Sequence, residues 1–132
     1  MTADTLAGMH GCPCLSGLPY DECCGPAHSG ATASPTAERL MRSRYSAFAM
    51  GLPAYLLASW HPSTRPKTLE LDESLRWYRL DILARTHGSM LDTTGTVEFI
   101  AYYRDGADRG TQRENSLFRR ENGRWFYVSA AS

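Results

Sequence analysis

The spacing of apolar residues changes along the chain, from a helical period in its first half to alternation in its second. Ser34 is placed to cap a helix whose first residue is Pro35. One face of this helix then carries Met41, Tyr45, Phe48 and Leu52. Three arginines fall largely off that apolar face: Arg39, Arg42 and Arg44. Because Gly51 is a typical C-terminal stop, the pattern predicts an amphipathic helix over residues 35–50.

A second, shorter helix is expected to follow. It starts at Pro53, and apolar residues continue along it to Trp60. It ends before Pro62, because a proline ring disfavours helical backbone in the residue ahead of it.

The second half of the chain alternates apolar and polar residues, which predicts strands. The expected strands cover residues 78–85, 96–104, 112–120 and 125–129. In the first of them, Tyr78 shares a face with Leu80 and Ile82. Two helices followed by four antiparallel strands predict an α+β domain, in which the helices cover one face of a curved sheet.

The pair Asn122-Gly123, between the last two strands, is a strong signal for a two-residue hairpin turn. The turn fixes which residues of the two strands pair. In that register Glu121 faces Arg124, Arg120 faces Trp125, Phe118 faces Tyr127 and Ser116 faces Ser129.

Composition and charge narrow the class of protein. The chain has 132 residues, of which 42% are apolar, and this suits one domain with a hydrophobic core and a small extra element. Its 14 basic and 14 acidic residues cancel, so no overall basic field attracts nucleic acid. The apolar runs are too short to span a membrane, and the first residues lack the pattern of a secretory signal. We therefore expect a cytoplasmic protein in a reducing compartment.

All the cysteines of the chain fall in one short segment: Cys12, Cys14, Cys23 and Cys24. Two close pairs separated by a turn-rich loop can converge on one tetrahedral Zn²⁺. Two disulfides are the alternative, but adjacent cysteines pair badly and disulfides do not persist in a reducing compartment. A reactive thiol is a third interpretation of these cysteines. His28 is a candidate to replace Cys24 as the fourth ligand, and His10 is a remoter one.

This segment resembles the SEC-C motif, a small zinc finger found at the C-terminus of the SecA translocation ATPase and in several bacterial proteins. The shared features are Cys-x-Cys, an eight-residue loop that begins after Cys14 and carries Ser16-Gly17, and the final cysteine pair. The SecA version carries lysines in the loop, whereas residues 1–28 here contain no Lys or Arg. The resemblance therefore implies zinc binding in a finger of residues 1–28, and it does not imply the SecA partner role.

The nine residues 25–33, which follow the last cysteine pair, are small, polar and without periodicity, which predicts a loop. A loop this short keeps the finger close to the first long helix. The finger also carries apolar residues that it is too small to bury by itself: Leu15, Leu18, Pro19 and Tyr20. We therefore expect the finger to pack on the larger domain.

Several short motifs follow one another in a fixed order along the chain. They are Cys-Pro-Cys with Cys-Cys-Gly-Pro, residues 40–48 (LMRSRYSAF), residues 60–64 (WHPST), residues 97–99 (VEF), Glu114-x-Ser116-x-Phe118 and Gly123-Arg124-Trp125. In these motifs, across almost its whole length, the chain resembles the bacterial YchJ family. The resemblance implies an N-terminal SEC-C finger over residues 1–28 and an NTF2-like cone of helices on a curved sheet over residues 29–132. It implies no particular activity.

One face of the last two strands has the composition of a ligand pocket. It carries an acid and hydroxyls among aromatic residues: Glu114, Ser116, Phe118, Arg120, Trp125, Tyr127 and Ser129. Trp60 and His61 are placed to close the mouth of such a pocket. The alternative is structural: Glu114 pairs with Arg42 or Arg44, and the aromatic side chains are core.

Two functional classes follow. In the first, the protein is a binding or adaptor module that engages a protein partner or a small ligand through the finger and the cone. In the second, it is an NTF2-like enzyme, an isomerase, dehydratase or hydrolase, with a pocket around Glu114 and His61 in which Glu114 acts as general base. The closed metal site favours the first class. Nucleic acid is disfavoured as a partner, and we expect a monomer or weak dimer.

Overall fold

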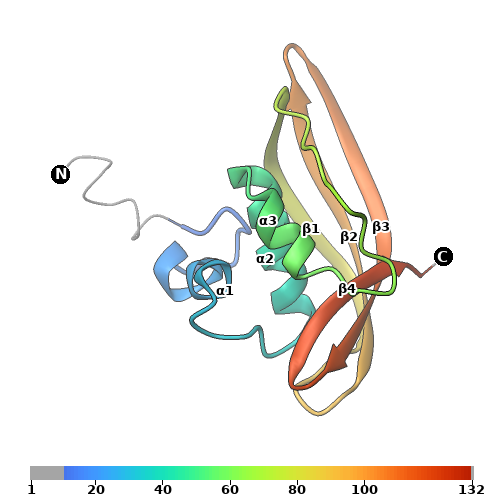
Figure 1. Ribbon diagram of the computed structural model, residues 1–132. Coiled ribbons are helices and arrows are strands. Elements are labelled where there is room, and N and C mark those ends of the chain that lie inside the picture. The colour runs from blue at the N-terminus through green and yellow to red at the C-terminus, as the bar shows by residue number, and fades with distance from the viewer. Residues whose placement is uncertain (1–10, 132) are drawn as a thin grey trace.

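The computed structural model describes residues 11–131, which form a four-stranded sheet with helices on one face and the finger beyond the helices (Figure 1). The helical elements are η1 (Tyr20–Glu22), α1 (Cys24–Ser29), α2 (Ala37–Met50) and α3 (Pro53–Ala58). The strands are β1 (Leu75–His87), β2 (Thr94–Asp105), β3 (Asp108–Glu121) and β4 (Arg124–Ala130). The α+β class predicted from the periodicity is confirmed.

The sheet is antiparallel throughout, with its strands in the order β1-β2-β3-β4. Asn122 and Gly123 both have positive φ, as a two-residue turn between β3 and β4 requires. The predicted pairs hold as far as Phe118 with Tyr127. A bulge between Leu117 and Phe118 then shifts the register, so that Ser116 pairs with Ala130 and not with Ser129.

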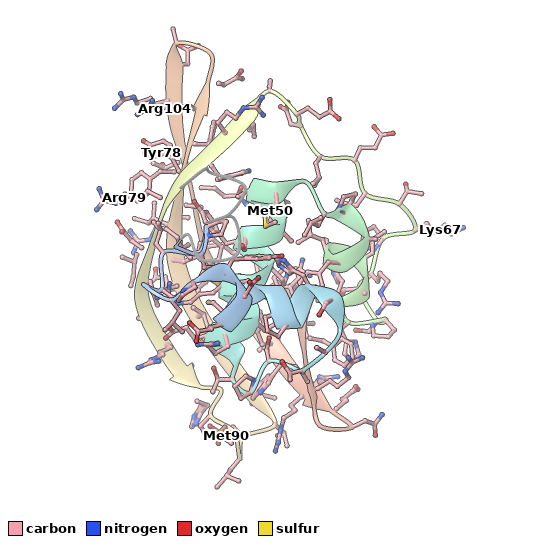
Figure 2. The ribbon with its side chains drawn as sticks, turned by 90° about the vertical axis from the view of Figure 1, so that its left-hand side faces the viewer. Met50, Lys67, Tyr78, Arg79, Met90 and Arg104 are labelled. Carbon is pink, nitrogen blue, oxygen red and sulfur yellow. The ribbon has the colours of Figure 1, made fainter. Side chains whose placement is uncertain are left out.

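Two bulges in β1 change which of its side chains point inward. The irregularities lie between Trp77 and Arg79 and between Ile82 and Ala84. The expectation that Tyr78 shares the inner face with Leu80 is therefore wrong, because the extra residue moves Tyr78 to the outer face. Figure 2 shows Tyr78 and Arg79 projecting away from the helices. Trp77 takes the inner position and contacts Tyr103 of β2.

Helix α2 begins and ends with residues suited to those positions. Its N-cap is Thr36, whose hydroxyl accepts a hydrogen bond from the backbone N–H of Arg39, so the prediction of Ser34 as cap was two residues early. Gly51 ends the helix in the left-handed conformation, as predicted. The inner face of α2 packs on the sheet in one core cluster that includes Leu40, Met41, Tyr45, Leu80, Val97, Phe118 and Trp125.

Arg44 departs from the sequence expectation, because it lies inside the domain and not off the apolar face. Its side chain is only 6% exposed. Its Nη1 donates to the carbonyl oxygen of Leu56 and to the hydroxyl of Ser59, both at 2.7 Å. The guanidinium group thereby holds the end of α3 against α2. The chain after α3 then bonds to β4, where His61 donates its backbone N–H to the carbonyl of Tyr127.

The segment 25–33, predicted to be a loop, begins with helix α1, so the prediction was wrong for residues 25–29 and holds for residues 30–33. The helix has six residues and ends at Gly30, which adopts the left-handed conformation. It starts at Cys24 and therefore continues directly from the last cysteine pair.

No helix within residues 11–131 has the length and apolar character needed to cross a membrane.

The two candidate caps of α2 provide a test of this local structure. Thr36→Ala removes the bond to the N–H of Arg39 and should lower the free energy of unfolding by about 1 kcal/mol. Ser34→Ala, the matched control, removes no cap and should cost less than half as much. Urea unfolding of both variants measures the difference, and equal losses would contradict the assignment of Thr36.

Candidate metal centre and cavity

Short backbone hydrogen bonds hold the first cysteine pair in a tight loop. The N–H of Cys12 donates to the carbonyl of Leu18 at 2.8 Å, and the N–H of Leu15 donates back to the carbonyl of Cys12 at 2.9 Å. Leu15 and Gly17 both have positive φ, which reverses the chain between the two pairs. These bonds turn the sulfur atoms of Cys12 and Cys14 toward the second pair.

The second pair is positioned by η1 and α1, which meet at Cys23 and Cys24. Gly25 is needed at this junction, because a Cβ atom there would lie 2.9 Å from the carbonyl oxygen of Tyr20. Any larger residue would push α1 away from η1. The glycine of the Cys-Cys-Gly-Pro segment thus has a steric role in bringing Cys24 to the site.

The four cysteine sulfurs lie within 4.8 Å of one another, and all four residues are buried. The Sγ atoms of Cys14 and Cys23 lie 3.5 Å apart, and none of the four cysteines is disulfide-bonded. Without a cation, hydrogen bonding to Cys12 and Cys14, together with burial, raises the pKa of the Cys24 thiol. A divalent cation would remove this restraint, because it stabilises all four thiolates at once. The donor set therefore fits a metal ion.

The histidines considered as alternative ligands are placed differently. His28 has both ring nitrogens engaged elsewhere, Nδ1 with the hydroxyl of Tyr20 at 2.7 Å and Nε2 with the carbonyl oxygen of Ser43 at 2.8 Å. It links the finger to α2 and is not part of the sulfur cluster. His10 lies outside the described residues.

The finger packs on α2, as predicted, but of the large apolar residues expected to be buried there, Tyr20 packs against the core whereas Leu15 and Leu18 do not. Leu15 and Leu18 remain exposed, whereas the four cysteines belong to the same buried cluster as the core of the domain. Tyr20 packs against that cluster. The Sγ of Cys12 also lies 3.7 Å from the hydroxyl of Ser46 on α2. The sulfur atoms themselves thus form much of the contact.

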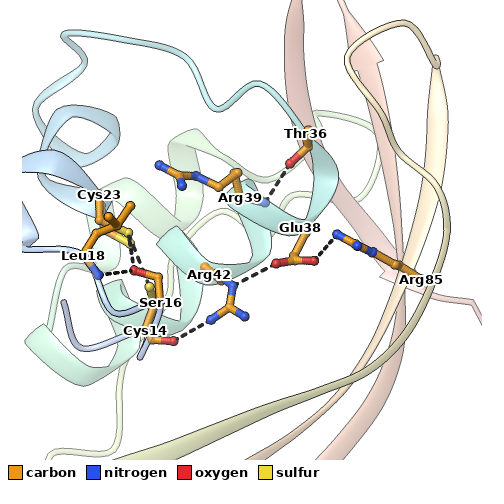
Figure 3. Close-up of polar contacts among 10 residues, drawn as sticks. Cys14, Ser16, Leu18, Cys23, Thr36, Glu38, Arg39, Arg42 and Arg85 are labelled. Carbon is orange, nitrogen blue, oxygen red and sulfur yellow. Dashed lines mark hydrogen bonds and ion pairs between the residues drawn. The ribbon is translucent and has the colours of Figure 1, made fainter. Parts of the chain in front are cut away.

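An arginine reinforces this contact on the outer side (Figure 3). Arg42 donates from Nη1 to the carbonyl oxygen of Cys14 at 2.8 Å and from Nε to Glu38 at 3.0 Å. Glu38 also pairs with Arg85 of β1. A continuous polar chain therefore joins the cysteine loop, α2 and the first strand.

A cavity of about 180 Å³ lies between α2 and the inner face of the sheet. Its lining residues are Met41, Arg44, Tyr45, Phe48, Trp60, Trp77, Phe99, Ala101, Gln112, Glu114, Ser116, Phe118 and Tyr127. Five of the residues expected around a pocket therefore lie on its wall: Trp60, Glu114, Ser116, Phe118 and Tyr127.

Four residues expected around the pocket are not on the cavity wall: His61, Arg120, Trp125 and Ser129. His61 bonds through Nε2 to Glu121 at 2.7 Å and through Nδ1 to the hydroxyl of Ser63. Trp125 donates its indole N–H to the carbonyl of Pro35 at 3.2 Å. The structure therefore does not bring Glu114 and His61 together at the cavity.

Glu114 is held by hydroxyl groups and not by an arginine. Its Oε2 accepts hydrogen bonds from Ser116 and, at 3.1 Å, from Tyr127. The structural alternative of an ion pair with Arg42 or Arg44 is wrong within residues 11–131, where those arginines bond to other groups. Burial, together with the carboxylate, raises the pKa of Tyr127 to about 12, so its hydroxyl stays protonated and donating.

The sequence did not predict the part of the cavity wall contributed by α2, β1, β2 and the first half of β3. The missed residues are Met41, Arg44, Tyr45, Phe48, Trp77, Phe99, Ala101 and Gln112. The helical period did signal three of them, since Met41, Tyr45 and Phe48 share the apolar face of α2. Only the packing of α2 across the sheet turns that face into a cavity wall.

Comparisons with known proteins agree with the description of the sheet domain and of the cysteine-rich finger. The family described as YchJ, middle NTF2-like domain, matches residues 36–130. A UPF0225 protein of Corynebacterium glutamicum is 54% identical over 116 residues, which cover 88% of this chain and 92% of that protein. A UPF0225 protein of Streptomyces coelicolor is 51% identical over 117 residues, which cover 89% and 91% of the two chains.

Two solved structures share the fold, and both are described as SEC-C motif containing proteins. The solution structure from Rhodopseudomonas palustris has a TM-score of 0.81 and 32% identity, and the match covers 93% of this chain and 98% of that one. The crystal structure from Psychrobacter arcticus has a TM-score of 0.77 and 27% identity, with coverage of 96% and 84%.

Paired substitutions test which side chains hold a metal. Cys24→Ser removes one of the four sulfurs and should reduce the metal content of purified, reduced protein to less than half. His28→Gln should leave the metal content unchanged but lower the free energy of unfolding by about 1–2 kcal/mol, because Tyr20 and Ser43 lose a partner. Metal analysis and urea unfolding measure the two effects. Metal loss in His28→Gln with retention in Cys24→Ser would reverse the assignment.

Proposed function

The chain belongs to the YchJ-like family with an NTF2-like domain, and on this premise we propose that it is a zinc-stabilised binding protein whose cone takes a small ligand. The observation that carries the zinc assignment is the convergence of four buried sulfurs within 4.8 Å. Soft thiolate donors in a set of four are typical of structural Zn²⁺ sites.

The closed donor set favours a structural role for the metal. Cys12, Cys14, Cys23 and Cys24 would supply all four ligands, so no position remains open for a substrate or water. A structural Zn²⁺ contributes free energy on the order of 10 kcal/mol to the fold around it. The SEC-C description of both structural neighbours supports the same reading.

The cavity supports binding over catalysis. The enzyme considered above places His61 beside Glu114 in one pocket. His61 is bonded to Glu121 instead, and no histidine lines the cavity formed by the described residues. The wall offers aromatic faces with a few polar groups, which is the usual make-up of a small-molecule site.

Metal analysis of protein purified under reducing conditions tests the zinc assignment. We expect one zinc per chain, and Co²⁺ substitution should give the absorption of a tetrahedral thiolate site. A stoichiometry near zero, or disulfides in the reduced preparation, would contradict it. The same protein after Cys14→Ser serves as the matched control and should lose the cobalt spectrum.

Binding of an uncharged aromatic probe tests whether the cavity takes ligands. Fluorobenzene should shift the amide NMR signals of Phe99, Ser116 and Phe118, which line the cavity, and leave those of the outer residues Tyr78 and Leu83 in place. An absence of shifts at the cavity residues at saturating probe would contradict the binding role.

A further inference from the structure

The cavity contains two opposite charges that do not pair with each other. The guanidinium group of Arg44 lies over the ring of Tyr127, with its central carbon 4.6 Å from the ring centroid. Glu114 bonds to the hydroxyl end of the same tyrosine. The ion pairs within residues 11–131 do not join Arg44 to Glu114. Tyr127 therefore stands between a buried cation and a carboxylate on the cavity wall.

Each of these two groups keeps polar atoms free. Arg44 uses Nη1 for its two hydrogen bonds, and its Nε and Nη2 have no partner among residues 11–131. Glu114 uses Oε2, and its Oε1 has no partner in the same range. In that part of the chain the Tyr45 hydroxyl is the one side-chain N or O atom that is both buried from water and unpartnered. The free atoms of Arg44 and Glu114 are therefore accessible to a molecule in the cavity.

These free atoms define what a bound molecule must offer. A guanidinium group only donates hydrogen bonds, and an ionised carboxylate only accepts them. A complementary molecule therefore supplies an acceptor to Arg44 and a donor to Glu114. An anion would be opposed by Glu114 and a cation by Arg44, so the molecule carries no net charge.

The rest of the wall sets the shape of the molecule. The apolar part is mainly aromatic, with Phe48, Trp77, Phe99 and Phe118 around the polar end. Flat rings pack well against such faces. A cavity of about 150 Å³ accommodates benzene, so the cavity of about 180 Å³ suits a single ring with a small substituent.

We propose that the cavity binds a small, uncharged, planar aromatic amide, with its carbonyl oxygen against Arg44 and its N–H against Glu114. This assignment rests on the proposed binding function and specifies its ligand class. An amide places an acceptor and a donor on one planar group without net charge, which meets both requirements of the wall.

Three probes of nearly equal size and shape test the assignment. Benzamide offers an acceptor and a donor, benzoate offers two acceptors and a negative charge, and benzamidinium offers two donors and a positive charge. NMR titration of the reduced, zinc-loaded full chain measures each dissociation constant. We expect benzamide to bind at least about tenfold more tightly than either charged probe, the size of one charge-assisted hydrogen bond.

Glu114→Gln provides the matched variant, because the side chain keeps its shape but becomes neutral and gains a donor. The preference for benzamide over benzoate should disappear in this variant, since the carboxylate that opposes benzoate is gone. The metal content should stay unchanged, because within residues 11–131 Glu114 bonds to Ser116 and Tyr127 and not to the cysteine cluster.

The outcomes separate this inference from the function on which it rests. If fluorobenzene binds in the cavity but benzoate or benzamidinium matches benzamide, the amide class is overturned and the binding role stands. If the preference for benzamide persists unchanged in Glu114→Gln, the assignment of Glu114 is overturned. If neither fluorobenzene nor any of the three probes shifts the cavity signals, both the inference and the binding role fail.

Discussion

The structure depends on the burial of four cysteine sulfurs in the same core as the domain that follows them. A loop of this size has almost no apolar interior of its own, and its larger apolar residues, Leu15 and Leu18, remain exposed. The loop instead buries its cysteine sulfurs against α2. Four thiolates cannot be packed together without a cation to offset their mutual repulsion. A metal ion held by these sulfurs would therefore organise the finger and also complete one face of the domain core.

Helix α2 connects the two sites because it is covered on both sides. The finger lies on one side, through the cysteine cluster, His28 and the bond from Arg42 to Cys14. The sheet and the cavity lie on the other, where α2 contributes Arg44 and Tyr45. Arg44 also fixes α3 through Leu56 and Ser59. A shift of α2 would consequently change the cavity wall and the finger contact together, although no residue belongs to both sites.

The parts of the fold that the sequence predicted are those set by local pattern. The helical period of apolar residues predicted α2, the pair Asn122-Gly123 predicted the last hairpin, and the spacing of the cysteines predicted the sulfur cluster. The failures depend on tertiary contacts. Helix α1 has six residues of small and cyclic types, too short to show a period. The alternation of apolar and polar residues does not reveal the bulges, which turn Tyr78 outward and pair Ser116 with Ala130. The sequence places Arg44 on the surface, because the acceptor that holds it inside comes from α3. It places His61 at a pocket, because its hydrogen bond to Glu121 is a tertiary contact.

We propose that the cysteine cluster, with the metal ion it can hold, is part of the domain core and not an independent appendage. Hydrogen exchange of the backbone amides, measured on the reduced protein with bound metal and after its removal by a chelator, tests this claim directly. The account predicts that metal removal lowers protection in the finger and also in residues 40–46 of α2, which pack against the sulfurs. Loss of protection confined to residues 11–30, with α2 unchanged, would contradict it.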